Sequence, residues 1–361
     1  MNSTGRIGRG ASGHRNRRRW AGRRRRRLSW GAVSDEAASE PAVREPHPVV
    51  PGETPAVYQP RDASTLGDEA PRRDPAEENS GRRRRLEYPP APEPLAVPVI
   101  DNHAHLDFRD GQVAVSVVEA LDAAASVGVA GAINVGYDVD SSEFSVRAAR
   151  QDGRLKAAVA LHPNDAPELA AVGQYDDALA RIAELAGDEE VVAVGETGLD
   201  YFRTGEEGRA AQRRSFADHL QLAAERGLPV QIHDRDAHDD VVAVLKDAPR
   251  LPEVVVFHCF SGDAELARIC SEHGWYMSFA GTVTFKNAEP LREGLDVADP
   301  ELILVETDTP FLTPHPHRGR PNAPYLIPQT MRLMAERRGV ELDALCRQVM
   351  DNTVRAYGAW L

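Results

Sequence analysis

The chain has 361 residues, a mass of 39.5 kDa and a formal net charge of −13 at pH 7. Its three cysteines form no CxxC pair, which excludes a disulfide scaffold and favours a reducing compartment. No apolar run approaches the ~18–20 residues that a membrane helix needs, so we expect a cytoplasmic protein with no membrane contact.

Residues 1–95 differ in composition from the rest of the chain. They are rich in Arg, Pro, Glu, Gly and Ser, and they hold 19 arginines against 13 acidic residues. Such a segment buries too little apolar surface to offset the entropy of ordering, so we predict a disordered extension. A solvated tail is the simplest interpretation, and a basic arm that contacts a polyanion is the alternative. The remaining residues are strongly acidic, which argues against broad, nonspecific binding of nucleic acid.

Residues 96–361 are predicted to form one domain in which strands and helices alternate. Short apolar runs predict eight strands, at 97–100, 131–137, 156–161, 191–196, 229–233, 254–258, 275–279 and 302–308. Repeated βα units predict a parallel sheet, and eight of them predict an α/β fold of the (β/α)8 TIM-like barrel type. A doubly wound open sheet is the alternative, but no GxGxxG motif follows the first strand.

Potential metal ligands occur at the carboxyl ends of five of these strands. They are His103, His105, Glu196, His233, His258 and Asp308. A single one of them has an ordinary explanation as a hydrogen-bonded or capping residue, but six on one predicted rim indicate a metal site.

The types and spacing of these residues suit metal chemistry. Strand side chains alternate, so His103 and His105 point to the same side and can bind one ion together. Imidazole and carboxylate ligands suit Zn²⁺, Mn²⁺, Ni²⁺ or Fe²⁺. Six ligands suffice for two divalent ions with one bridging carboxylate, and a two-metal site activates water for a displacement reaction.

Several motifs follow one another in order along this domain. They are "IDNHAHLDF", "LHPNDA", "GETGLDY", "LPVQIHDRDAHDD", "FHCFSG", "SFAGTVTFKNA" and "ETDTPFLTPHPHRGRPNAP". From about Val99 to the C-terminus, the chain resembles the TatD family of metal-dependent hydrolases, a branch of the amidohydrolase superfamily. The resemblance implies a TIM-like barrel with two divalent ions (Mg²⁺, Mn²⁺ or Zn²⁺) and deoxyribonuclease activity. Residues 1–95 match nothing in that family.

The resemblance also implies roles for the six candidate ligands. His103, His105, Glu196 and Asp308 would hold one ion, and Glu196 would bridge to a second ion bound by His233 and His258. Asp308 and Glu196 are thus the candidate catalytic residues, with Asp308 as the base that orients the attacking water. Phosphotriesterase- and lactonase-like relatives instead bridge their metals with a lysine at the end of strand four. This chain has three lysines and none at that position.

Three further residues are candidates for binding substrate phosphate. His162 follows the third strand, and Lys286 and Arg318 lie in the loops after the seventh and eighth strands, where barrels often bind phosphate. Ordinary loop or solvated residues are the alternative interpretation of all three.

We therefore expect a metal-dependent hydrolase, most simply a deoxyribonuclease that attacks single-stranded DNA or 3′ ends in the manner of a 3′-5′ exonuclease. Hydrolysis of an ester or amide, for example deacylation of aminoacyl-tRNA, is the second hypothesis. A nucleic-acid-binding scaffold without catalysis is the third, and the complete ligand set speaks against it.

Overall fold

The computed structural model describes residues 49–60, 85–108, 110 and 113–361. Within these residues, eight parallel strands form one sheet in which each strand pairs with the next one along the chain. The strands are β1 (Val99–Ala104), β2 (Val129–Val135), β3 (Leu155–Val159), β4 (Val191–Asp200), β5 (Val230–Arg235), β6 (Val255–Phe257), β7 (Tyr276–Phe279) and β8 (Ile303–Val305).

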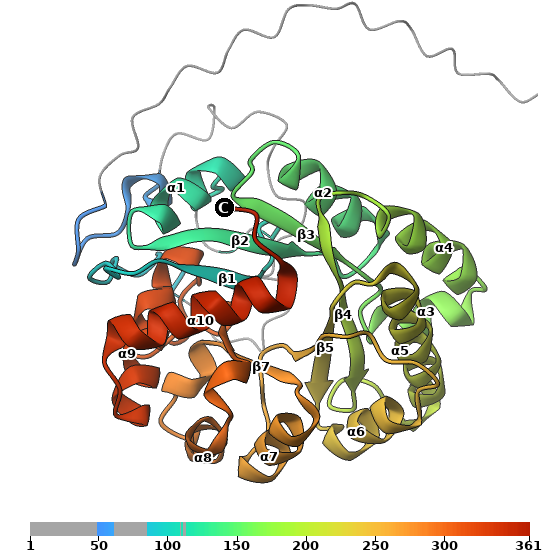
Figure 1. Cartoon of the computed structure of the whole chain (residues 1–361). Helices are drawn as coiled ribbons and strands as arrows, with labels where there is room; N and C mark the ends of the chain where they lie inside the picture. The colour runs from blue at the N-terminus through green and yellow to red at the C-terminus, as the bar shows by residue number, and fades with distance from the viewer. Residues whose placement is uncertain (1–48, 61–84, 109, 111–112) are drawn as a thin grey trace, which may run out of the picture. The chain divides into compact units, whose positions relative to one another are not determined.

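Helices surround this sheet in chain order, as Figure 1 shows. They are α1 (Val117–Ala125), α2 (Val139–Ala149), α3 (Asp165–Ala171), α4 (Tyr175–Leu185), α5 (Glu206–Arg226), α6 (His238–Asp247), α7 (Ala264–His273), α8 (Glu289–Val297), α9 (Ile327–Arg338) and α10 (Leu342–Tyr357). Short 3₁₀ turns add η1 (Ala56–Tyr58), η4 (Gly281–Thr284), η5 (Pro300–Leu302) and η6 (Pro324–Leu326).

The sheet closes where its first and last strands end. The backbone N–H of Asp308 donates to the carbonyl of His103 at 2.9 Å, and the N–H of His105 donates to the carbonyl of Thr309 at 2.9 Å. These bonds join the end of β1 to the segment that follows β8. The predicted (β/α)8 TIM-like barrel with eight strands is therefore confirmed. The largest differences are at β1 and β4, which both run four residues past their predicted ends.

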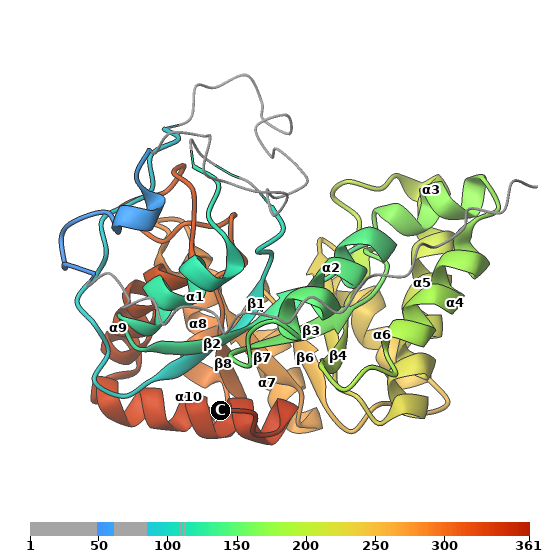
Figure 2. The same cartoon turned by 90° about the horizontal axis from the view of Figure 1, so that it is seen from above.

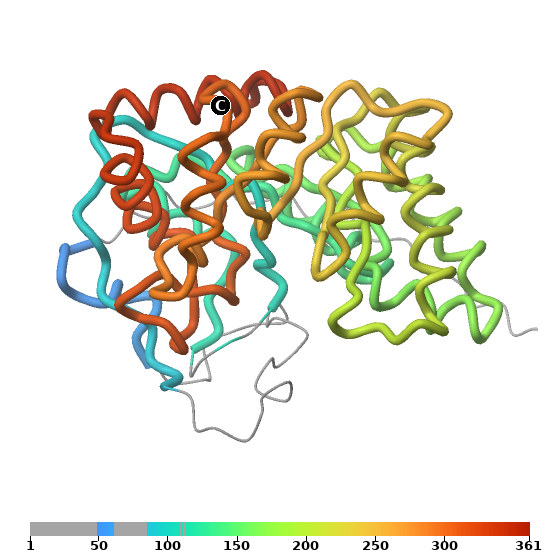
Figure 3. Tube along the Cα trace, turned by 90° about the horizontal axis from the view of Figure 1, so that it is seen from below, coloured from blue at the N-terminus to red at the C-terminus, as the bar shows by residue number. Residues whose placement is uncertain are grey.

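The barrel interior is apolar at one end and polar at the other. Ile133, Val256 and Leu304 belong to the apolar part, together with Tyr357 from α10. Figures 2 and 3 show α10 on one side of the barrel, while the loops after β1 and β8 extend on the opposite side. The candidate ligands are at the second end, where parallel strands of a barrel present their carboxyl termini.

Part of the predicted extension is packed structure. Tyr58, Tyr88 and Leu95 are buried in the main core, and the ring of Tyr58 lies 4.9 Å from that of Tyr325. The expectation that all of residues 1–95 are disordered is thus wrong for 49–60 and 85–95. The other residues of that extension lie outside the described part of the chain.

Among the described residues, no helix is long and apolar enough to span a bilayer.

Candidate metal centre

The six predicted ligands come together at the carboxyl ends of the strands. Three neighbouring groups of their side chains, one of which also includes His162, place potential ligand atoms within 4.8 Å of one another. His103, His105, Glu196 and His258 are buried, while Asp308 and His233 are partly exposed. The site is therefore deep in the barrel but open on one side.

Four of these side chains, from His103, His105, Glu196 and Asp308, form what we call the first group. Nε2 of His105 lies 3.3 Å from Nε2 of His103, 3.3 Å from Oε1 of Glu196 and 3.5 Å from Oδ1 of Asp308. Nε2 of His103 lies 3.8 Å from Glu196 Oε1 and 3.9 Å from Asp308 Oδ1. Two imidazoles and two carboxylates thus face one small volume.

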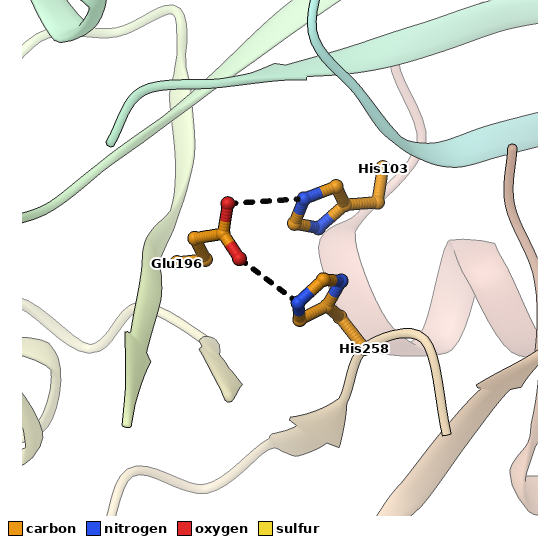
Figure 4. A group of neighbouring side chains, drawn as sticks. All are labelled: His103, Glu196 and His258. Carbon is orange, nitrogen blue, oxygen red and sulfur yellow. Dashed lines mark ion pairs between the residues drawn. The ribbon is translucent and has the colours of Figure 1, made fainter. Parts of the chain in front are cut away.

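The second group is built on the other oxygen of Glu196. Oε2 lies 2.9 Å from His258 Nε2 and 3.1 Å from His233 Nδ1. Figure 4 shows the carboxylate of Glu196 between His103 and His258, with one oxygen directed at each ring. This arrangement suits a carboxylate that bridges two cations.

Outer partners fix which ring nitrogen of each histidine faces the site. The carbonyl of Val135 lies 2.9 Å from Nδ1 of His105 and can only accept, so Nδ1 carries the proton and Nε2 is left with a lone pair. Gln231 does the same for His103, because its amide nitrogen donates elsewhere and its Oε1 lies 3.0 Å from Nδ1. Such partners orient metal-binding imidazoles and raise their basicity.

Two carboxylates that sequence reasoning missed hold the second pair of histidines. Asp200 Oδ2 lies 3.4 Å from Nε2 of His233, and Glu306 Oε1 lies 3.3 Å from Nδ1 of His258. Alternation along the strand was an available signal, because Asp200 follows Glu196 by four residues and Glu306 precedes Asp308 by two.

The charges at the site are strongly coupled. Burial disfavours the charged form of His258, but Glu196 and Glu306 outweigh it and raise its pKa to about 10. Burial likewise opposes the charge on Glu196, and the surrounding histidines hold its pKa well below the ordinary value. The carboxylates therefore attract positive charge, which either protons on histidines or divalent cations can supply.

Two residues beside the ligands have a left-handed backbone. Asp308 has φ +54° and Cys259 has φ +42°. This conformation costs a non-glycine residue ~1–3 kcal/mol, and the hydrogen bonds from Asp308 N to His103 and from Cys259 N to Glu306 hold it in place. Both turns lie where a strand of the barrel ends, and the turn at Asp308 carries a candidate ligand.

His162 lies at the second group as a neutral donor. Its Nδ1 accepts a hydrogen bond from the N–H of Asn164 at 3.0 Å, and burial lowers its pKa to about 3. The single proton is therefore on Nε2, which lies 3.7 Å from Oε2 of Glu196. A protonated nitrogen cannot bind a metal but can donate to an oxygen of a substrate.

Lys286 and Arg318 lie on neighbouring loops and are exposed. The guanidinium of Arg318 lies 4.4 Å from the ring centroid of Phe285, next to Lys286. The two loops are tied together by the N–H of His315, which donates to Thr284 Oγ1 at 2.7 Å. Neither residue contacts the predicted ligands, and their role in phosphate binding stays a prediction.

The donor set fits divalent cations. Four imidazole nitrogens and three carboxylate oxygens face the site from five strand ends, and each imidazole has an outer partner. Imidazole with carboxylate is a usual ligand set for Zn²⁺, Mn²⁺ and Fe²⁺, and these ligands are too close together to stay unneutralised.

Comparisons with known proteins agree with this geometry. The sequence model of a family described as TatD related DNase matches residues 100–358. A metal-dependent hydrolase of Mycobacterium tuberculosis, called TatD and described as uncharacterized, is 42% identical over 268 residues, covering 73% of this chain and 99% of that protein. A protein of Erwinia billingiae described as a 3′-5′ ssDNA/RNA exonuclease TatD is 35% identical over 246 residues, covering 66% of this chain and 92% of that protein.

A solved structure is also similar. YJJV from Escherichia coli, described as a TatD homologue, superposes with a TM-score of 0.65 at 27% identity, covering 72% of this chain and 98% of that one. Sequence and fold thus point to one group of proteins.

Proposed function

Because the chain belongs to the TatD family of metal-dependent hydrolases, we propose that it hydrolyses phosphodiester bonds in DNA, starting from a 3′ end of a single strand. The observation that carries this proposal is the position of the Glu196 carboxylate. One of its oxygens faces His103, and the other faces His258. The Erwinia protein described as an exonuclease supports the choice of substrate. A paired site of this kind suits displacement at phosphorus, where the attacking and leaving oxygens both need stabilisation.

The residues would hold two divalent ions, Mg²⁺, Mn²⁺ or Zn²⁺. His103, His105 and Asp308 would hold one, His233 and His258 the other, and Glu196 both. When bound, such ions make a water molecule more acidic and stabilise negative charge on phosphate oxygens.

The side chains of the chain itself supply orientation and proton transfer. Asp308 is partly exposed at the open side of the site, so its carboxylate can accept the proton of the attacking water. Nε2–H of His162 donates to a phosphate oxygen, because its other nitrogen is occupied by the Asn164 N–H. Asp200 and Glu306 hold the rings of His233 and His258 in place.

The test compares wild type with Asp308→Asn and Glu196→Gln on a 5′-labelled single-stranded oligonucleotide, with Mg²⁺, Mn²⁺ or Zn²⁺ added. Wild type should shorten the strand from its 3′ end, and either substitution should lower kcat by at least ~100-fold. Asp308→Asn removes the proposed proton acceptor, and Glu196→Gln removes the charge of the carboxylate that would hold both ions. Glu336→Gln, an exposed carboxylate on α9, is the matched control and should behave as wild type.

Two results would overturn the proposal. One is wild-type turnover by both site variants, and the other is the absence of cleavage with every metal. A parallel assay on an aminoacyl ester tests the alternative chemistry. Ester hydrolysis without DNA cleavage would show that the substrate is an ester and not a nucleic acid. The cytoplasmic location and the contact of the arginine-rich arm with a polyanion stay predictions.

A further inference from the structure

One aromatic side chain at the mouth of the barrel is exposed to solvent. Phe202 follows the end of β4 by two residues, and 63% of its surface is accessible. Among the described residues, the other large apolar side chains with comparable exposure are valines and a leucine. Exposed aromatic rings beside a catalytic centre are typical of ligand-binding surfaces.

An arginine from the next strand lies against this ring. The Cζ atom of Arg235 is 4.1 Å from the ring centroid of Phe202, a cation–π contact. Arg235 is the last residue of β5 and pairs in register with Asp200, while His233 precedes it by two residues on the same side of the strand. Its backbone is therefore ~6.6 Å further along the strand than that of a candidate ligand.

The charge of Arg235 is not neutralised by a carboxylate of the described chain. Arginines on α5 show the contrast, because Arg213 pairs with Asp240 and Arg214 pairs with Asp176. In a domain with an acidic total charge, an unpaired guanidinium near the site is available for an anion of the substrate.

We infer that Phe202 and Arg235 form a nucleotide subsite, in which Arg235 binds a backbone phosphate and the free face of Phe202 stacks on the adjoining base. This inference rests on the proposed function and extends it to how the strand is held. Stacking of this kind needs an unpaired base, because the faces of a paired base are covered by its neighbours in the duplex. The subsite therefore selects single-stranded DNA or a frayed 3′ end over intact duplex.

The experiment uses four full-length variants: Phe202→Ala, Phe202→Tyr, Arg235→Gln and the control Arg214→Gln. Two single-stranded oligonucleotides are compared, one with all its bases and one with a tetrahydrofuran abasic unit near the 3′ end. Cleavage gives kcat and KM. Fluorescence anisotropy of labelled strands on Asp308→Asn versions gives binding without turnover.

Phe202→Ala should raise KM and the dissociation constant for the complete strand by ~5- to 100-fold, which is the range for loss of one stacked base. Phe202→Tyr should restore binding, and on the abasic strand Phe202→Ala should match wild type. Arg235→Gln should weaken binding of both strands, because both keep the phosphate. Arg214→Gln should change neither.

The inference is overturned if Phe202→Ala weakens the complete and the abasic strand equally, or if Arg235→Gln binds as well as Arg214→Gln. The proposed function can fail separately: wild type that does not cut DNA would disprove it, while the anisotropy series still decides the subsite. Conversely, wild-type cleavage of DNA by every variant would disprove the subsite and support the proposed nuclease activity.

Discussion

Glu306 shows how one buried residue shapes this site. It is fully buried, its Oε1 accepts the N–H of Cys259 at 2.7 Å, and the same oxygen lies 3.3 Å from Nδ1 of His258. These contacts keep the proton of His258 on Nδ1 and leave Nε2 to face Glu196. Glu306 is therefore a positioning residue that acts through His258.

Glu306→Ala should selectively weaken the binding of one of the two proposed ions. Removing the outer partner of a metal-binding histidine lowers metal affinity by ~10–100-fold. Calorimetric titration of chelator-treated protein with Mn²⁺ should show two binding steps. In the variant, one step should have a lower affinity than in wild type, and the other should have the same affinity. Glu306→Gln should lose less affinity, since its amide oxygen can still accept both N–H groups. Two unchanged steps in the Ala variant would contradict the assigned role.

At the scale of elements, a carboxylate joins the first and last strands. Asp101 of β1 is fully buried, and it accepts hydrogen bonds from the N–H of Thr307 at 2.9 Å and from its Oγ1 at 2.5 Å. Burial raises the pKa of Asp101 to about 8. This clamp fixes the start of the segment that carries Asp308 against the strand that carries His103.

Thr307→Val should loosen this closure. The substitution keeps the shape but leaves a buried carboxylate oxygen without its donor, which costs ~1–3 kcal/mol. Urea unfolding should show a lower midpoint with the same slope, whereas Thr307→Ser, which keeps the hydroxyl, should remain close to wild type. A Val variant as stable as wild type would show that the clamp contributes nothing to stability.

The strands could be predicted from sequence because parallel strands covered on both faces are short apolar runs. The position of the candidate ligands on one rim could be predicted for a related reason, since the carboxyl ends of the strands of a barrel meet there. Asp200 and Glu306 were missed because a carboxylate at a strand end has the same appearance in sequence as a helix cap. Alternation along the chain places both on the side of Glu196 and Asp308, but which histidine each one contacts depends on packing between strands, which local patterns do not encode.

The packed part of the N-terminal segment was missed for a different reason. Tyr58 and Tyr88 are isolated aromatic residues among proline and charged residues, and neither belongs to a periodic pattern. Their rings contact each other at 4.6 Å between centroids, and the ring of Tyr58 also contacts Tyr325, which is far away in the chain. Composition is an average over a whole segment and predicts only its general character. Whether a few aromatic rings in it are buried depends on the part of the folded domain against which they pack.

For the whole molecule, stability should depend on pH and on metal. His258 has a pKa of about 10 in the folded chain and an ordinary value of ~6.5 when unfolded. The stabilising proton is therefore fully present below about pH 6.5 and is lost as pH rises toward 10, and the raised pKa of Asp101 acts in the same direction.

Thermal unfolding in the presence of a chelator should thus show a melting temperature that falls from pH 6.5 to 10. Excess Mn²⁺ should raise the melting temperature, and more so at higher pH, because ligand histidines bind metal only when deprotonated. Circular dichroism at several pH values with chelator or metal measures both trends. A melting temperature that rises with pH in chelator would contradict the charge arrangement at the site.

The position of the ligands in the chain has a consequence for synthesis. His103 is on the first strand of the barrel, while Asp308 follows the last, and their backbones are joined by a hydrogen bond. A nascent chain that has released β1 to β7 from the ribosome has five of the six ligands but lacks Asp308 and the segment that closes the barrel. In the proposed mechanism hydrolysis needs Asp308, so it can begin only after the whole barrel sequence has been translated.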